Sequence, residues 1–329
     1  MIDMVLQMNK YNNKTFLVSG ATGLIGKTIV KHLLETDANI ICSVRNIEKA
    51  KTIFGDTDRI IYIIGDIQTL PIEDRRVNYI IHAAAETSSK AFINKPVDII
   101  ETSFFGTKRI LDFALKNHVE SIVYLSSMEV YGAPVTDDKI VESSGTTLNT
   151  MDVRSSYPES KRICESLCRA YTAQYDLPVK TVRLTQTFGE GVQYNDPRVF
   201  AEFARCAIEK KDIILHSSGE TKRNYLYTQD AVSAILTVLI EGKDGEAYNA
   251  ANESTYCSII EMANMVAKEC ANNEIDVIIE NKENISEYGY APILKMNLST
   301  AKLQQLGWYP TTSLKEMFTR LIADMQHNR

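Results

Sequence analysis

Tyr157 and Lys161 form the pair of residues in this sequence with the plainest potential for chemistry. They are four positions apart in a segment of helical spacing, so both side chains lie on one helix face, and Pro158 suits the first turn of that helix. A lysine ammonium beside a phenol lowers the pKa of the phenol from about 10 towards neutrality. We therefore expect Tyr157 to act as a general acid or base, although an aromatic residue and a lysine also meet at this spacing by chance.

Position favours the catalytic interpretation of this pair. The apolar run that precedes the helix ends in Ser126 and Ser127, and a serine hydroxyl there can hydrogen-bond the same substrate oxygen as Tyr157. The sequence thus places a hydroxyl, a phenol and an ammonium group at one strand end and the helix that follows it.

Three glycines, Gly20, Gly23 and Gly26, fall within seven residues of a chain that has only 15. They separate a β-rich run (14–19) from a helical run (24–34). Glycine permits a tight turn, lets backbone N–H groups approach a pyrophosphate and allows the helix to pack closely on the sheet. The turn predicts a phosphate-bearing cofactor, with a plain strand-to-helix turn as the alternative.

The end of the second predicted strand indicates which dinucleotide binds. An NAD enzyme usually has an acidic residue there, about 20 residues after the turn, to hold the ribose 2′-hydroxyl. This chain has Arg45 instead, which can neutralise a 2′-phosphate, so NADP is favoured over NAD; the alternative is an ordinary solvated arginine. Asp66 and Ile67, after the third strand, fit a pair that contacts adenine, although Asp66 also suits a plain loop.

Continuous apolar runs alternate with helical segments as far as residue 184, which is typical of a parallel sheet covered on both faces. Strands are expected at 14–19, 39–44, 59–64, 79–83, 121–126 and 179–184, with the long helices at 24–34, 96–116 and 158–175. Beyond residue 189 the alternation loosens, and the pieces near 276–279 and 314–325 indicate a second lobe. The predicted fold class is α/β, a Rossmann-type doubly wound parallel sheet with a smaller C-terminal substrate-binding lobe.

The expected domain boundaries follow from this pattern. Residues 14–188 with about 224–251 form the dinucleotide-binding domain, residues 189–223 with 252–329 form the substrate-binding lobe, and residues 1–13 are an N-terminal extension.

Composition excludes several classes of partner. The net charge is −6, and no basic stripe long enough for nucleic acid is present. The longest apolar stretch, 231–240, has about half of the ~20 residues needed to cross a bilayer, and the N-terminus lacks the charge order of a signal peptide. The six cysteines form no disulfide framework or metal motif, so we expect a cytoplasmic protein without a metal, a membrane anchor or bound nucleic acid.

The motifs together resemble the extended short-chain dehydrogenase/reductase family, the NAD(P)-dependent nucleotide-sugar epimerases and dehydratases. The resemblance runs from about residue 15 to 325, and the motifs occur in the family's order. They are GATGLIG (20–26), IIHAAA (80–85), SSMEVYG (126–132), YPESK (157–161), RNYLYTQDAV (223–232), YNAAN (248–252) and KLQQLGWYPTTSLKEM (302–317).

The resemblance implies a role for each matching residue. Tyr157 would be the acid/base at the sugar 4-hydroxyl, Ser127 the catalytic hydroxyl, and Lys161 the residue that binds the nicotinamide ribose and tunes Tyr157. Hydride would pass from sugar C4 to the nicotinamide, leaving a 4-keto sugar. The implied cofactor-binding residues are Gly20, Thr22, Gly23, Leu24, Ile25, Gly26, Arg45, Asp66, Ile67, Ala83, Ala84, Ala85, Ser103, Tyr157 and Lys161; the substrate-binding residues are Thr87, Ser127, Gln186, Arg198 and Arg223.

Glu129 bears on the fate of the ketone. In the family a glutamate at this position is typical of enzymes that act beyond C4, the 4,6-dehydratases and nucleotide-sugar decarboxylases, although Glu129 can also be only a structural hydrogen-bonding residue. The dTDP-glucose-type dehydratases carry an aspartate just before it, where this chain has Met128. The segment from Arg154 to Arg162 most resembles that of the UDP-glucuronate decarboxylases.

Ser103 and Gln186 stand where the family usually has asparagine, which leaves the sugar, the nucleotide and the product open. The resemblance also implies a homodimer formed through the helices 96–116 and 158–175. One alternative is an NADPH-dependent ketone or aldehyde reductase of the same fold. An alternative of another class is a non-catalytic dinucleotide-sensing protein, against which the intact Ser127, Tyr157 and Lys161 argue.

Overall fold

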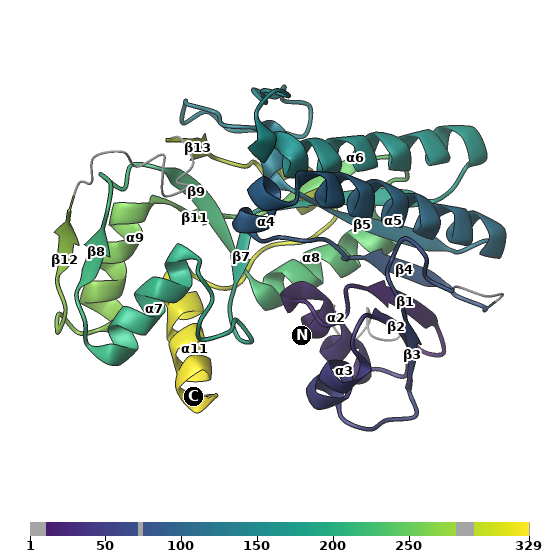
Figure 1. Ribbon diagram of the computed structural model, residues 1–329, viewed down its shortest axis with the longest axis horizontal. Helices are drawn as coiled ribbons and strands as arrows, with labels where there is room; N and C mark the ends of the chain where they lie inside the picture. The colour runs from purple at the N-terminus through teal and green to yellow at the C-terminus, as the bar shows by residue number, and fades with distance from the viewer. Residues whose placement is uncertain (1–10, 72–74, 281–292, 329) are drawn as a thin grey trace. The chain divides into compact units, whose positions relative to one another are not determined.

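The computed structural model describes residues 11–71, 75–280 and 293–328, and Figure 1 shows the course of the chain. The chain divides into two compact units. The first comprises residues 1–130, 148–183 and 232–248, and the second residues 131–147, 184–231 and 249–329.

The first unit is built on a seven-stranded sheet with the strand order β10-β6-β5-β4-β1-β2-β3. The pairs from β5 to β3 are parallel, with Leu17 opposite Ile41 on one side and Ile80 on the other. The strands are β1 (Thr15–Ser19), β2 (Asn39–Val44), β3 (Ile60–Ile64), β4 (Tyr79–His82), β5 (Ser121–Ser127), β6 (Val179–Leu184) and β10 (Ala247–Ala250). This sheet confirms the predicted fold class.

Helices connect these strands, as a parallel sheet requires. They are α2 (Leu24–Leu34), α3 (Ile47–Phe54), α4 (Ser89–Asn94), α5 (Pro96–Asn117), α6 (Ser156–Tyr175) and α8 (Thr228–Glu241), with 3₁₀ turns η1 (Met128–Tyr131) and η2 (Val153–Ser155). Residues Thr228–Ala231 of α8 fall in the second unit.

Helices α5 and α6 lie side by side (Figure 1) and share one core with the sheet. Ile110 and Ala114 of α5 and Cys164 of α6 are fully buried in that core. Pro96 begins α5, and Asp176 ends α6 in the left-handed conformation, so the sequence sets both ends of the pair. This packing fixes α6, which carries Tyr157 and Lys161, against the sheet.

The second unit contains a four-stranded sheet, a two-stranded sheet and several helices. Its elements are β7 (Gln186–Phe188), α7 (Val199–Glu209), β8 (Ile213–Leu215), β9 (Lys222–Tyr227), β11 (Asn252–Ser258), α9 (Ile259–Met265), the π-helix η3 (Val266–Cys270), β12 (Val277–Ile279), β13 (Lys295–Met296), α10 (Ala301–Gln304) and α11 (Leu314–His327). Capping boxes, Ser258 with Glu261 and Ser313 with Glu316, begin α9 and α11.

The segment 131–147 belongs to the second unit, although it lies inside the range 14–188 predicted for the dinucleotide-binding domain. Hydrogen bonds explain its place: Tyr131 Oη donates to Asn249 Oδ1 at 2.7 Å, and the Ile140 amide donates to the carbonyl of Asn297 at 2.8 Å. Most of the expected N-terminal extension lies outside the described residues. Of the helices in the described ranges, none has both the length and the apolarity to cross a membrane.

Candidate active site

Tyr157 lies in the first turn of α6, and its side chain is buried, with a residue exposure of 7%. Its ring stacks on Phe92 of α4, with centroids 4.3 Å apart and planes 8° apart. Ser156 Oγ donates to the carbonyl of Phe92 at 3.0 Å, which ties α4 to the start of α6. The phenol is therefore held by packing on one face, and it shares a hydrogen bond with Ser127 at the end of β5.

Lys161 lies one turn further along α6 and is 4% exposed. Its Nζ donates to the carbonyl of Leu125 at 2.7 Å and lies 4.9 Å from the centroid of the Tyr124 ring. Burial lowers the pKa of Lys161 to about 8, while the charge of Glu165 acts in the opposite direction. The structure thus brings Ser127, Tyr157 and Lys161 together where β5 ends and α6 begins.

The expectation that Lys161 lowers the pKa of Tyr157 is wrong for the protein alone. Burial raises the pKa of Tyr157, the negative charge of Glu129 raises it further, and the hydrogen bond from Ser127 lowers it. Desolvation wins because the phenolate would be an ion in an apolar pocket. Burial and the charge of Glu129 thus both favour the neutral phenol of Tyr157.

Glu129 lies in η1, directly after β5, and forms an ion pair with Arg154 of η2 in which Nη1 and Oε2 are 3.2 Å apart. Its backbone amide donates to Ser127 Oγ at 3.2 Å. Met128, between the two, is 6% exposed and carries no proton to give. Glu129 is thus the carboxylate whose negative charge raises the pKa of Tyr157.

The glycine turn between β1 and α2 has no room for side chains. A Cβ at Gly20 would lie 2.8 Å from the backbone of Ala83 and Ala84, and a Cβ at Gly26 would lie 2.1 Å from the carbonyl oxygen of Gly20. Gly20 also has φ +68, and Gly23 stands at the N-cap of α2 without a side-chain cap. Free N–H groups at a helix start, approached by bare backbone, fit a pyrophosphate.

The other residues predicted to hold the cofactor follow strands β2, β3 and β4 or lie in the glycine turn and in α5. Arg45 is exposed directly after β2, Asp66 is exposed after β3, and Ile67 is buried where a Cβ at Gly106 would lie 2.7 Å from it. The amide of Ala84 donates to Ser19 Oγ at 3.2 Å. Thr22, Leu24, Ile25, Ala83, Ala85 and Ser103 are all partly exposed.

The residues predicted to bind substrate are divided between the two units. Thr87, which is exposed, and Ser127 lie in the first unit. Gln186, Arg198 and Arg223 lie in the second. Gln186 of β7 pairs with Tyr225, two residues from Arg223 on β9. Arg198 already holds Asp196, with Nη2 2.6 Å from Oδ2, and the Nε of Arg223 is buried without a partner among the described residues.

Two residues at the site have no signal in the sequence pattern. Phe92 lies on α4, a six-residue helix too short to show a periodic apolar pattern. The approach of Arg154 to Glu129 joins residues 25 positions apart, and no spacing rule predicts it. Packing and charge pairing at this range are visible only in the folded chain.

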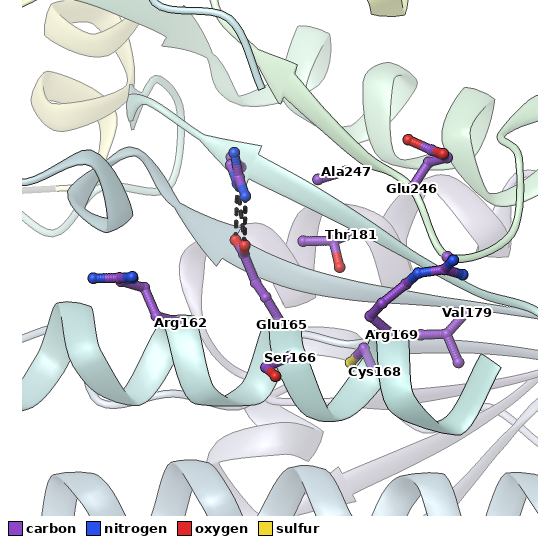
Figure 2. Close-up of a pocket in the computed structure, with 11 residues that line it drawn as sticks. Arg162, Glu165, Ser166, Cys168, Arg169, Val179, Thr181, Glu246 and Ala247 are labelled. Carbon is purple, nitrogen blue, oxygen red and sulfur yellow. Dashed lines mark hydrogen bonds and ion pairs between the residues drawn. The ribbon is translucent and has the colours of Figure 1, made fainter. Parts of the chain in front are cut away.

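A pocket of about 310 Å³ lies along α6 (Figure 2), and Tyr157 is not among the residues that line it. Residues of α6, β6 and the start of β10 line it, and dashed lines in Figure 2 mark the bonds that Glu165 accepts from Arg183. Nε and Nη2 of Arg183 donate to Glu165, with Nη2 2.6 Å from Oε2, and both side chains are 14% exposed. This ion pair fastens α6 to β6 one helical turn after Lys161.

Comparison with known proteins agrees with this geometry. The model of the NAD dependent epimerase/dehydratase family matches residues 16–251. The chain belongs to this family. The resemblance to extended short-chain dehydrogenases/reductases is thereby confirmed, as is the class of enzyme, an NAD-dependent epimerase/dehydratase.

Members of the NAD dependent epimerase/dehydratase family match along almost the whole chain. UDP-glucuronic acid decarboxylase 3 of Arabidopsis thaliana is 30% identical over 311 residues, which cover 92% of this chain and 86% of the relative. The dTDP-D-glucose 4,6-dehydratase of Homo sapiens is 26% identical over 330 residues, which cover 96% of this chain and 91% of the relative. The solved UDP-glucose 4-epimerase of Thermotoga maritima has the same fold, with a TM-score of 0.81, 20% identity and coverage of 95% and 99%.

The lowered pKa of Lys161 makes the free energy of unfolding rise with pH. Its pKa is lowered from 10.5 to about 8, so the folded protein binds fewer protons than the unfolded chain between these values. The cost of burying the charge is complete below about pH 8 and disappears towards pH 10.5, so stability gains up to roughly 3 kcal/mol with rising pH. We expect Lys161→Met to lack this gain. Urea unfolding of both proteins across this range checks it; parallel curves would contradict it.

Proposed function

We propose that the protein converts a nucleotide-linked sugar through a 4-keto intermediate, with hydride leaving sugar C4 for a bound nicotinamide dinucleotide. The observation that carries the proposal is Glu129 beside Tyr157 and Ser127, a carboxylate next to the hydroxyl pair at which a ketone would form. The names of the relatives, a UDP-glucuronic acid decarboxylase and a dTDP-D-glucose 4,6-dehydratase, support it.

The residues of the first unit have distinct roles in this proposal. The backbone of the turn from Gly20 to Gly26 holds the pyrophosphate, and Lys161 holds the nicotinamide ribose. Tyr157 takes the proton of the 4-hydroxyl while Ser127 hydrogen-bonds the same oxygen. When bound, the oxidised nicotinamide accepts the hydride and brings a positive charge that opposes the effect of burial on the pKa of Tyr157.

Glu129 acts on the ketone that results. Met128 cannot expel a 6-hydroxyl, which disfavours dehydration of the dTDP-glucose type. We favour decarboxylation of a nucleotide-linked uronic acid, because its 4-keto form is a β-keto acid. There carbon dioxide leaves as the C5–C6 bond breaks, and the electron pair of that bond forms a C4–C5 enolate. C5 then takes a proton that Glu129 relays from solvent. Finally C4 regains the hydride while its oxygen regains the proton from Tyr157, so the cofactor ends the turnover oxidised.

The two ranges proposed for the lobes divide the remaining work. The range 14–188 with about 224–251 would carry the dinucleotide, except for residues 131–147, 184–188, 224–231 and 249–251, which fall in the second unit. The range 189–223 with 252–329 would carry the nucleotide sugar. Arg223, whose buried Nε has no partner among the described residues, and Arg198 would bind the diphosphate, and Gln186 the sugar. The reducing cytoplasm suits the six cysteines, all free.

Incubation with UDP-, dTDP-, GDP- and CDP-sugars and their uronic acids, with products identified by mass, tests the reaction. We expect a uronic acid to lose the mass of carbon dioxide. Tyr157→Phe should lower the rate of cofactor reduction by roughly 10²- to 10⁴-fold, because no other group takes the hydroxyl proton. Glu129→Gln should still allow cofactor reduction but slow product formation. The absence of product from every sugar would refute the proposal.

We propose NADP as the preferred cofactor, on the strength of Arg45. This guanidinium is exposed and has no described hydrogen bond or ion pair, and it follows β2, where a ribose 2′-phosphate would lie. Arg45→Ala should weaken NADP binding by about ten- to a hundredfold and leave NAD binding unchanged. Calorimetry with both cofactors measures this, with Lys51→Ala as the matched control. Equal loss of both cofactors would contradict it.

We also propose a homodimer formed through α5 and α6. Large apolar side chains are exposed on them: Val97 62%, Ile100 46%, Phe105 49%, Ile163 46% and Tyr175 46%. Large apolar side chains exposed on two paired helices suit a protein interface. Light scattering should give twice the chain mass for the native protein and for Val135→Glu, the control, and the chain mass for Phe105→Glu. A monomeric native protein would contradict the proposal.

A further inference from the structure

The ion pair of Arg154 with Glu129 orients the Glu129 carboxylate but contributes little to the stability of the fold. Both side chains are partly exposed, 34% and 27%, so the pair contributes at most about 1 kcal/mol to stability. The backbone of Arg154 is nevertheless fixed on both sides. Asp152 Oδ1 accepts its amide at 2.9 Å, and Ser155 Oγ donates to the carbonyl of Asn149 at 2.7 Å.

The two oxygens of Glu129 are not equivalent. Arg154 Nη1 donates to Oε2 at 3.2 Å, whereas Oε1 has no hydrogen bond to any residue that the structure describes. The backbone of Glu129 is held from the other side by its amide hydrogen bond to Ser127 Oγ. The carboxylate is thus fixed at its backbone and at one oxygen, which leaves the other oxygen free to exchange a proton.

Charges of both signs lie close to Tyr157 at this end of α6. Glu129 is the negative charge that acts on Tyr157, and Lys161 lies on the same helix with its ammonium 5.9 Å from the centroid of the Tyr157 ring. Arg154 places a positive charge next to Glu129, with Nη1 3.2 Å from Oε2. A guanidinium in this place limits how strongly Glu129 disfavours the phenolate, and it keeps the carboxylate from turning away.

We propose that Arg154 is a positioning residue: it holds Oε2 of Glu129, so that Oε1 is the oxygen that exchanges a proton with the substrate. The part that concerns substrate rests on the proposed function, whereas the pairing itself does not. Arg154 does not touch the reacting atoms and acts only through Glu129.

Three variants separate positioning from folding. Arg154→Gln removes the charge, Arg154→Lys keeps it without the planar guanidinium, and Arg162→Gln is the matched control. Arg162 is also a partly exposed arginine near the start of α6, paired with Glu159 at 3.4 Å. Thermal unfolding should show all three folded, because exposed pairs of this kind contribute little.

The first measurement needs no substrate. In isotope-edited infrared spectra of protein labelled with ¹³C-glutamate, the band lost in Glu129→Gln belongs to Glu129. We expect this band to move in Arg154→Gln and to stay in place in Arg162→Gln, because its frequency reports the hydrogen bond to Oε2. An unmoved band in Arg154→Gln would overturn the proposal whatever the enzyme's reaction is.

The second measurement follows two steps with the converted sugar. Arg154→Gln should reduce the bound cofactor within about threefold of the native rate with little change in KM, but slow proton delivery from solvent to the sugar at least tenfold. Arg154→Lys should recover part of that loss. The double variant with Glu129→Gln should be no slower than Glu129→Gln alone, because Arg154 acts through Glu129. Additive losses, or equal loss in both steps, would overturn the proposal. If no sugar reduces the cofactor, the proposed function fails and the infrared result still decides the pairing.

Discussion

The hydrogen bond from Lys161 Nζ to the carbonyl of Leu125, 2.7 Å long and buried, is the interaction on which the site depends. It joins β5, two residues before that strand ends, to α6. It thereby sets where the helix starts relative to the end of β5. Tyr157, one turn earlier, then meets Ser127. The packing of α5 on α6 and the bond of Glu165 to Arg183 keep the helix in this position. The fold serves the chemistry mainly by holding this register.

Burial changes the pKa of both Tyr157 and Lys161. It raises the pKa of Tyr157 and lowers that of Lys161, so burial disfavours the charged form of both side chains. In the proposed reaction the phenol would act as a base once the positive charge of the bound oxidised cofactor offsets the effect of burial. Glu129 opposes that change, and Arg154 limits its opposition. Proton chemistry at the site is thus set by a balance among four side chains on α6, η1 and η2.

The sequence predicts the parts of this arrangement that depend on local periodicity or on motif order. Alternating apolar runs predict the parallel sheet, and the glycine turn, Ser127, Tyr157 and Lys161 are visible because their spacing is fixed by a turn or a helix. Short elements such as α4 and β7 carry too few residues to show a pattern. The antiparallel pair β9 and β11, with a register shift between Asn252 and Cys257, is also invisible locally. The raised pKa of Tyr157 depends on three-dimensional burial, which residue types alone do not reveal.

In the proposed reaction the hydride taken from sugar C4 returns to the sugar within one turnover. The most direct test is to supply the converted nucleotide sugar with deuterium at C4, in the presence of unlabelled cofactor, and to locate deuterium in the product by mass and NMR. The account predicts that nearly all of the deuterium stays in the sugar product, because the Tyr157 site holds the cofactor through the whole reaction. Deuterium in the free cofactor pool would contradict it, because the sugar would then undergo a net oxidation.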